Sequence, residues 1–380
     1  MIVKIGDVIS EYSVRNKFDE NIPVYSVTNE KGFCTGYFSK EVAGKDKSTY
    51  KIVPRGYFAY NPSRINVGSV DWQKYEDRVI VSPLYVVFGV SDRLDRQYLL
   101  HYLKGDMMLS FIKEYATGSV RDNLKLTDLG KFPINLRPVE EQRQIAATLD
   151  KIDDLIDKRR QQLDKLDELV KSRFIEIFGD PENNNKAWKV KFLDNLCTVG
   201  SSKRVYQSEQ SSEGVPFWRI SDLVSKIDTG TVDSALFISK TKYTELKQAG
   251  LVPVTGDILL TSRGTLGRCY IIKDEDRFYF QDGMISWLSN YSEEITPLYL
   301  QYLFSMSGFR KQIDKLQAGS TVAYLSIAML KKLQVMVPDK TLQKQFAAFV
   351  TQVDKSKLAI QKSLEKLEIL KKALMQKYFG

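Results

Sequence analysis

Histidine, cysteine and long apolar runs are scarce in this chain of 380 residues, and each scarcity removes a class of function. His101 is the single histidine, and the cysteines, Cys34, Cys197 and Cys269, form no CxxC pair. Zinc sites, disulfides and histidine-based chemistry are therefore not expected, and a reducing cytoplasm is the default location. No run of about 18 uncharged apolar residues occurs, so we expect no membrane span. The first residues show no apolar signal-peptide core.

Cofactor and phosphate motifs are also missing. The sequence contains no GxxxxGK[ST] loop and no GxG-rich turn of the kind that opens a Rossmann methyltransferase. Asn61-Pro62-Ser63-Arg64 is superficially similar to the Asn-Pro-Pro-aromatic motif of amino-methyltransferases, but it lacks the second proline and the aromatic residue, so we interpret it as a loop. No Asp…Glu-x-Lys nuclease set stands out, although such a set is too degenerate for its absence to exclude a nuclease. We expect this chain not to be an enzyme by itself.

The net charge is the first feature that indicates a class of partner. The formal net charge is +9, with 43% hydrophobic and 27% charged residues, which is an ordinary composition for a soluble protein. The excess of lysine and arginine is spread over both large segments, 1–137 and 180–337, and is not confined to a tail. A basic surface favours an acidic partner such as nucleic acid.

The chain repeats itself at an offset of about 200 residues, which is the signature of an internal duplication. Residues 142–146 match 343–347, and Phe178-Gly179 matches the final Phe379-Gly380. Before the helical part the agreement is patchier: residues 98–103 align with 298–303, which places His101 opposite Gln301. Two copies of this size indicate duplicated domains and not a solenoid.

Each copy ends in a long helical pattern whose seam positions alternate steps of four and three. That spacing is the 3.5-residue period of a coiled-coil seam. In the first copy the positions are Ile152, Ile156, Arg159, Leu163, Leu166, Val170, Arg173 and Ile177; in the second they are Val353, Lys357, Ile360, Leu364, Leu367, Lys371, Leu374 and Tyr378. Neither segment contains proline or glycine, and Gly179 ends the first one. A helix over 139–178 would be about 60 Å long at about 1.5 Å per residue.

Two packing arrangements are open for these helices: each packs on its own domain, or the two pair with each other. Their net charges are opposite in sign, and long cations interrupt both seams, which favours pairing. With the order globule–helix–globule–helix, antiparallel pairing predicts a dumbbell with approximate two-fold symmetry. The residues that we expect to form the pairing seam are Ile152, Ile156, Leu163, Leu166, Val170, Val353, Ile360, Leu364, Leu367 and Leu374.

The predicted fold class is α+β (mixed α/β), with two globular domains separated by two long antiparallel, coiled-coil-like helices and related by an internal pseudo-two-fold repeat. The predicted boundaries are 1–137 for the first globule, 138–179 for the central helical spacer, 180–189 for a linker, 190–337 for the second globule and 338–380 for the C-terminal helical spacer. In each globule, strand-like runs, among them 79–90 and 278–288, precede one amphipathic helix, over 96–115 or 297–316.

Two loop motifs recur in both globules. One is a strand that enters a small polar loop with one arginine between glycines, at 54–68 and again at 254–267; the other is a Gly-Ser loop, at 116–123 and again at 317–324. Small residues let a backbone approach a phosphate, and arginine can bind guanine with two hydrogen bonds. The alternative is that these are tight turns whose arginines only confer solubility.

The sequence resembles the specificity subunits of type I restriction–modification systems over essentially its whole length. The most specific part runs from Pro138-Val139-Glu140-Glu141-Gln142 through Ile145-Ala146 to Asp153, and is similar to the opening of the family's central helical region. Gly179-Asp180-Pro181 followed by Trp188 is similar to its exit. Gly256-Asp257-Ile258-Leu259 with Ser262-Arg263-Gly264 and Gly267 resembles a common segment of the recognition domains. Thr341-Leu342-Gln343 and Gly56-Tyr57 depart from the family's pattern, which weakens any transfer of roles to single residues.

The resemblance implies a non-catalytic subunit that binds double-stranded DNA. Each globule would be a target recognition domain for one half of a split, asymmetric sequence, and the helical spacers would set the gap. Two methyltransferase subunits and, for restriction, motor-nuclease subunits would be its partners, and S-adenosylmethionine, ATP and magnesium would bind to those partners. The residues that we expect to contact DNA are Asn61, Ser63, Arg64, Arg121, Lys125, Lys203, Arg204, Tyr206, Arg219, Ser262, Arg263, Thr265 and Tyr324.

Two rival functions stay open at this point. One is an antiparallel coiled-coil scaffold that joins protein partners without reading DNA; the arginine-bearing glycine loops argue against it. The other is a nuclease or methyltransferase that acts alone; the missing cofactor motifs argue against that.

Overall fold

The computed structural model describes residues 1–36, 46–116, 123–317 and 323–380. Contacts divide the chain into two compact units: unit 1 comprises 1–161 with 361–380, and unit 2 comprises 162–360. Each unit therefore contains one globule together with a part of both long helices, because α4 (Val139–Phe178) and α10 (Lys340–Phe379) each run from one unit into the other.

The globule of unit 1 is built mainly from short strands followed by short helices. In chain order its elements are β1 (Ile2–Lys4), η1 (Ile5–Asp7), β2 (Ile9–Glu11), β3 (Ser26–Thr28), β4 (Gly32–Cys34), β5 (Lys51–Pro54), β6 (Phe58–Tyr60), η2 (Ile65–Val67), β7 (Val70–Trp72), β8 (Arg78–Val81), β9 (Val86–Val90), α1 (Arg96–Lys104), α2 (Asp106–Ala116), α3 (Leu126–Leu129) and β10 (Pro133–Asn135). The central sheet has the order β2-β9-β6-β7, and β1-β10, β3-β4 and β5-β8 form separate two-stranded ladders.

The globule of unit 2 repeats this frame and adds to it. Its elements are β11 (Lys189–Phe192), η3 (Leu193–Asn195), β12 (Thr198–Gly200), η4 (Gln207–Glu209), β13 (Gln210–Ser211), β14 (Val215–Trp218), α5 (Ile220–Thr229), β15 (Phe237–Ile238), α6 (Lys240–Gln248), β16 (Ile258–Thr261), β17 (Cys269–Ile271), β18 (Tyr279–Phe280), β19 (Ile285–Ser289), α7 (Pro297–Ser305), α8 (Ser307–Gln317), α9 (Ile327–Lys331) and β20 (Gln334–Val337).

The duplication is confirmed by the strand order. The sheet β12-β19-β16-β17 of unit 2 has the order of β2-β9-β6-β7 in unit 1, and β11-β20 corresponds to β1-β10; all these pairs are antiparallel. The units differ in their additions: unit 2 has α5, α6 and the sheet β13-β15-β14-β18, whereas unit 1 has the ladders β3-β4 and β5-β8. The predicted mixed fold class is therefore correct, and the patchy sequence agreement before the helices has its cause in these additions.

The single amphipathic helix predicted in each globule is wrong, because two helices stand in its place. α1 and α2 are separated by Gly105, and α7 and α8 by Met306; both residues have extended backbone, with ψ of 145° and 134°. Glycine is a poor helix former, which accounts for the first break. At the second break, the Ser305 hydroxyl donates to the Tyr302 carbonyl at 2.6 Å, so it satisfies an acceptor that the helix end leaves free.

The register of the repeat in these helices also differs from the sequence alignment by one residue. Asp95 caps α1 and Thr296 caps α7, and the hydroxyls of Tyr98 and Tyr299 donate to carbonyls of the equivalent strands β10 and β20, both at 3.0 Å. Tyr98 therefore corresponds to Tyr299. It follows that the counterpart of His101 is Tyr302, and not Gln301.

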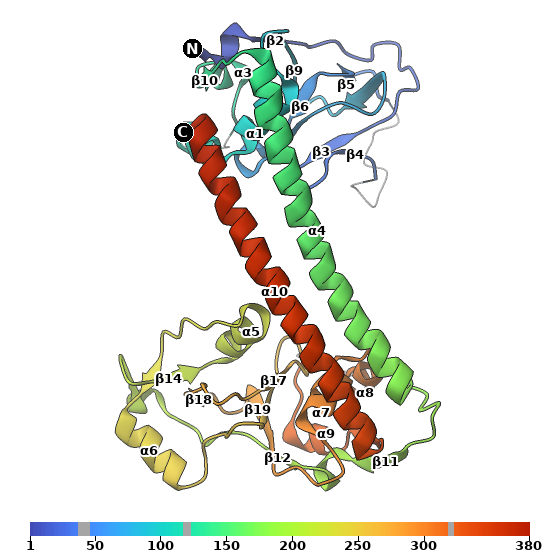
Figure 1. Cartoon of the computed structure of the whole chain (residues 1–380), viewed down its shortest axis with the longest axis vertical. Helices are drawn as coiled ribbons and strands as arrows, with labels where there is room; N and C mark the ends of the chain where they lie inside the picture. Colours follow the sequence, from blue (N-terminus) through green and yellow to red (C-terminus); the bar gives the residue numbers. More distant parts are fainter. Residues whose placement is uncertain (37–45, 117–122, 318–322) are drawn as a thin grey trace. The chain divides into compact units, whose positions relative to one another are not determined.

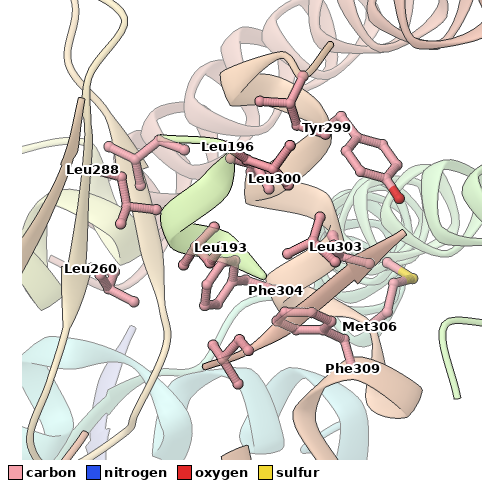
Figure 2. Close-up of a cluster of buried hydrophobic side chains, with 14 of the residues drawn as sticks. Leu193, Leu196, Leu260, Leu288, Tyr299, Leu300, Leu303, Phe304, Met306 and Phe309 are labelled. Carbon is pink, nitrogen blue, oxygen red and sulfur yellow. The ribbon is translucent and has the colours of Figure 1, made fainter. Parts of the chain in front are cut away.

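The core of unit 2 lies where the sheet meets α7 and α8. Figure 2 shows leucines of β16 and β19 facing Leu193, Leu196 and the aromatic and leucine side chains of α7. The end of α4 completes this core: Phe178 is fully buried, with its ring centroid 4.9 Å from that of Tyr299 and 5.4 Å from that of Phe346 at the start of α10. Unit 1 is completed in the same way by the end of α10, whose Phe379 packs on Tyr98 at 4.9 Å.

Within each unit the two long helices pair antiparallel, as expected. Each helix is continuous over 40 residues (Figure 1). In unit 1, Asp153 binds Lys371 at 2.5 Å and Arg160 binds Glu368 at 2.9 Å; in unit 2, Asp167 binds Lys357. As the residue number rises along α4 it falls along α10, which defines the antiparallel direction.

Burial along the expected seam is uneven. Exposed fractions of 1% to 6% are found at Ile152, Ile156, Val170, Val353 and Leu364. Half-buried positions are Leu163, Leu166, Ile360, Leu367 and Leu374. Exposed ion pairs contribute little to stability, so the apolar contacts hold the helices together.

A buried glutamine fixes the start of each long helix to its globule. In unit 2, Gln343 is 1% exposed, and its Oε1 accepts from the backbone N–H of Thr296 at 2.9 Å. Its Nε2 donates to the carbonyls of Glu294 at 2.8 Å and Pro338 at 2.9 Å. One side chain thus satisfies three backbone groups that burial would otherwise leave unpaired.

The same arrangement is found in unit 1. Gln142 is fully buried; its Oε1 accepts from the Asp95 N–H at 2.8 Å, and its Nε2 donates to the carbonyls of Arg93 at 2.9 Å and Arg137 at 2.7 Å. The glutamine common to the two copies of the sequence is therefore a structural residue that joins each helix to the cap of α1 or α7.

Replacing this glutamine should destabilise the fold. Gln343→Ala removes the partners of two carbonyls and one N–H, and each unpaired buried group costs roughly 1–3 kcal/mol. We expect the free energy of unfolding to fall by about 3 kcal/mol in urea denaturation of the full chain. Gln345→Ala, two residues along on the exposed side of α10, is the matched control, and its effect should stay within about 0.5 kcal/mol. Equal losses in the two variants would contradict this role.

Candidate nucleic-acid interface

In each globule the arginine loop lies beside the residue that follows the Gly-Ser motif; the Gly-Ser residues themselves, within 117–122 and 318–322, lie outside the described part of the chain. In unit 1 the Pro62 carbonyl accepts from the Leu124 N–H at 3.2 Å, and in unit 2 the Ser262 carbonyl accepts from the Leu325 N–H at 2.9 Å. The arginine loop and the leucine after the Gly-Ser motif are thus joined by an equivalent backbone hydrogen bond in both units. Sequence spacing alone does not predict this contact.

In unit 1 this junction presents small polar groups beside one cation. Asn61 is half-buried and its Oδ1 accepts from the Ser63 N–H at 3.1 Å, while the Ser63 hydroxyl donates to Asn123 Oδ1 at 2.6 Å. Arg64 is exposed. Lys125 is also exposed and precedes α3, whereas Arg121 lies outside the described residues.

The turn after Arg64 requires a glycine. Gly68 has φ of 86°, a conformation that L side chains rarely adopt, and a Cβ there would come within 2.7 Å of Asn29 Oδ1. The glycine therefore allows the chain to leave the exposed loop and return at once into β7.

In unit 2 the same junction holds an arginine against an aromatic ring. Arg263 forms an isolated β-bridge with Tyr324, and its guanidinium carbon lies 5.8 Å from the centre of the Tyr324 ring. Gln317 fixes Tyr324 from the other side: its Oε1 accepts from the Tyr324 N–H at 2.8 Å and its Nε2 donates to the Tyr324 carbonyl at 2.7 Å. A guanidinium stacked on a tyrosine keeps its hydrogen-bonding edges free for a ligand.

This junction forms one wall of a groove of about 480 Å³ in unit 2. Among its lining residues are four that the sequence singled out, from three separate segments: Arg204, Tyr206, Arg263 and Tyr324. The Tyr206 side chain is 63% exposed, and Arg204 Nε donates to Asp282 Oδ2 at 2.8 Å. Exposed aromatic rings and oriented guanidinium groups along a groove are the chemistry that binds nucleic acid bases and phosphates.

Three further predicted residues lie outside the set that lines the groove. Lys203, Arg219 and Thr265 are exposed, and Arg219 directly precedes α5. Their contact with DNA stays a prediction.

Ser262 requires a correction. It is 2% exposed, and its hydroxyl lies 2.6 Å from the hydroxyl of Ser286 inside the sheet. Ser262 directly follows β16, and the two buried hydroxyls satisfy each other. The structure therefore leaves the Ser262 side chain no surface with which to reach a ligand.

Several groove residues were missed by the sequence reasoning. Gln281, Asp282 and Gly283 line the groove and occupy a turn between β18 and β19, with φ of 71° at Gly283. We expected one strand over 278–288, which concealed this turn. The Asp-Gly pair within an otherwise apolar run is the signal that could have revealed it.

A hollow of about 1150 Å³ in unit 1 lies elsewhere, and its walls include α1, α4 and α10. His101 is 8% exposed there, and its Nε2 lies 2.8 Å from Asp150 Oδ1. Burial acts to raise the pKa of Asp150, but hydrogen bonds from His101 and Gln97 outweigh it, so the pKa lies below its usual value. The histidine thus connects α1 to α4, which is a structural role.

The described residues, 1–36, 46–116, 123–317 and 323–380, contain no group of three or more histidine, cysteine, aspartate or glutamate side chains placed to hold a metal ion. No helix among them is long and apolar enough to cross a membrane.

Comparison with known proteins points to one family. The profile of the type I restriction modification DNA specificity domain matches residues 2–168 and again 185–371. A Haemophilus influenzae protein described as a type I restriction enzyme specificity subunit is 26% identical over 328 residues, which cover 84% of this chain and 76% of that protein. The type I restriction enzyme MjaVIII specificity subunit of Methanocaldococcus jannaschii is 26% identical over 299 residues, covering 74% and 69%.

A solved structure shares the fold. The crystal structure of a type I restriction-modification S subunit from M. genitalium superimposes with a TM-score of 0.58 at 17% identity, over 100% of this chain and 96% of that chain. The similarity extends over both units and shows a shared fold.

Removal of the Arg263 guanidinium should weaken the binding of duplex DNA. We expect Arg263→Ala to reduce the slope of log affinity against log salt by about one unit, as for the loss of one phosphate contact. Fluorescence anisotropy with a random-sequence duplex over a salt series measures this slope. The control is Arg277→Ala, an exposed arginine of the same unit that stacks on Tyr243 away from the groove. If both variants keep the native slope, Arg263 does not contact a phosphate.

Proposed function

Because the chain belongs to the type I restriction modification DNA specificity family, we propose that it is the subunit that reads a bipartite, asymmetric DNA sequence, one half with each unit. The observation that carries this proposal is the duplicated frame: the same sheet order occurs twice, and in each copy an arginine-bearing loop is joined by the same backbone hydrogen bond to Leu124 or Leu325. Two copies of one architecture with different side chains at the junction suit two half-sites that differ in sequence.

The two long helices would set the gap between the half-sites. Each is continuous for 40 residues, and the apolar seam and ion pairs within each unit stiffen the pair. A stiff connection makes the second binding event intramolecular. Two domains that each bind a short sequence weakly therefore bind the combined sequence tightly and specifically. Phosphate contacts would supply affinity, and a few side chains would supply sequence specificity.

Catalysis would belong to partner subunits. We propose that two methyltransferase subunits associate with the chain, and that motor-nuclease subunits join them for restriction. S-adenosylmethionine, ATP and magnesium would then be bound by those subunits and not by this one. The groove of unit 2 supports a binding role, because the arginine, tyrosine and glutamine side chains along it are groups that bind nucleic acid.

The rival function is a coiled-coil scaffold that joins protein partners without reading DNA. A gel shift with random duplex DNA separates the two, since the scaffold predicts no retarded band. Methylation or cleavage by the purified chain alone would support the other rival, an enzyme that acts without partners.

Co-expression with the methyltransferase subunits of the same system tests the proposal directly. Methylated adenines mapped across the host genome should define one motif made of two short specified parts separated by a fixed unspecified gap. A short continuous motif would contradict the two-reader arrangement, and methylation without any motif would contradict sequence recognition.

Shortening both helices should change the gap and nothing else. Deletion of seven residues, two turns of the seam pattern, from the middle of both α4 and α10 keeps the apolar positions aligned. We expect the mapped motif to keep both half-sites and to lose about three base pairs of gap, since the two deleted turns span about 10 Å of helix and the duplex rises 3.4 Å per base pair. An unchanged gap with intact half-sites would show that the helices do not set the spacing.

A further inference from the structure

Arg204 combines an exposed side chain with a fixed orientation. Its side chain is 64% exposed, whereas that of its partner Asp282 is 21% exposed. Arg204 Nε donates to Asp282 Oδ2 at 2.8 Å. Exposed arginines normally sample many rotamers, so a carboxylate that holds Nε selects one direction for the guanidinium.

The backbone on the Arg204 side is anchored by a buried tyrosine. The Tyr279 hydroxyl accepts from the Lys203 N–H at 2.9 Å and donates to the Lys203 carbonyl at 3.1 Å, and Tyr279 itself is fully buried. On the other side of the arginine, Val205 is 8% exposed and belongs to the same apolar cluster as Tyr279. Arg204 therefore projects from a segment that is held on both sides.

The backbone on the Asp282 side is held as well. The Gln281 N–H donates to the Trp218 carbonyl at 2.9 Å, and the Gly283 N–H donates to the Ser201 hydroxyl at 3.4 Å. The carboxylate thus stands on a turn that is tied to two other segments of unit 2. Both residues of the ion pair are therefore held in position by the protein itself, without a ligand.

Arg204 lines the groove, and part of its guanidinium is not bound within the protein. Within the described chain, the hydrogen bond of Arg204 is made by Nε, which leaves the two terminal amino groups without a hydrogen-bond partner. These two groups form the fork that binds O6 and N7 of guanine in the major groove. A phosphate would be repelled by the neighbouring Asp282 carboxylate, whereas the edge of a neutral base would not. The acceptor that fits best is therefore guanine.

Arg268 provides the contrast within the same unit. It also pairs with an aspartate, but both of its terminal amino groups bind the carboxylate of Asp228, one of them at 3.1 Å. Both terminal amino groups of Arg268 are therefore bound within the protein, and Arg268 is not among the residues that line the groove. An arginine–aspartate pair alone is thus not what distinguishes Arg204; the free fork is.

We propose that Arg204 specifies one guanine in the half-site read by unit 2, and that Asp282 is the positioning residue that aims its guanidinium at that base. This inference rests on the proposed DNA-reading function and adds to it the residue and the base. Tyr206, exposed on the same wall of the groove, would flank the contact.

The test is selection of binding sites from a random duplex library, with the full chain purified together with its methyltransferase subunits. We expect the native protein to enrich a motif with a fixed guanine in one half-site. Arg204→Ala should lose the preference at that one position, with the affinity for the native site reduced about 5- to 150-fold. Asp282→Asn should relax the same position to a lesser degree. Arg268→Ala should enrich the native motif.

The outcomes separate the two proposals. If the native complex enriches no motif, the proposed function fails. If it enriches a motif that Arg204→Ala and Asp282→Asn both leave unchanged, the inference fails and the function stands. Arg204→Gln guards against misfolding: it keeps a long polar side chain but has no guanidinium, so it should also lose the guanine preference. A Gln variant with the native preference would contradict the inference.

Discussion

The structure depends on the burial of the apolar stripe of each long helix, which a single helix would expose to water. A helix of 40 residues with an apolar stripe must cover that stripe with another surface, and α4 and α10 cover each other. The ends of the same helices then complete the two globular cores: Phe178 packs against Tyr299 and Phe346 in unit 2, and Phe379 packs on Tyr98 in unit 1. The helices and the globules therefore stabilise each other. The buried glutamines Gln142 and Gln343 fix the other ends of the helices by the same scheme in both units.

That shared dependence explains where the two copies agree and where they differ. The residues that join helix to globule are repeated because the same packing is needed twice. The additions, α5 and α6 in unit 2 and the ladders β3-β4 and β5-β8 in unit 1, are attached to the repeated sheet and can differ without disturbing it. The side chains at the loop junctions differ too: Ser63 and Asn123 meet in unit 1, whereas Arg263 and Tyr324 meet in unit 2. A repeated frame with divergent loops suits two domains that bind different DNA sequences.

The sequence predicted the long helices, their antiparallel pairing and the duplication, because a 3.5-residue period over 40 residues is a strong signal. It did not predict the breaks at Gly105 and Met306, since the apolar pattern continues across both and the extended backbone of a single residue ends each helix. In the candidate site, the arginine loops were identified from their glycines. The burial of Ser262 and the Arg204–Asp282 pair depend on contacts between segments distant in the sequence, which no local pattern contains.

The central claim is that each unit binds its own stretch of one DNA duplex. Hydroxyl-radical footprinting of the chain with its methyltransferase subunits, on a duplex that carries the mapped motif, tests it most directly. The account predicts two sets of protected nucleotides around the half-sites. At a protein concentration that saturates the half-site of unit 1, the protection at the half-site of unit 2 should weaken when Arg263 and Arg204 are replaced together, while the other half-site stays protected. Simultaneous loss of protection at both half-sites in that variant, or one continuous footprint that it leaves unchanged, would contradict the account.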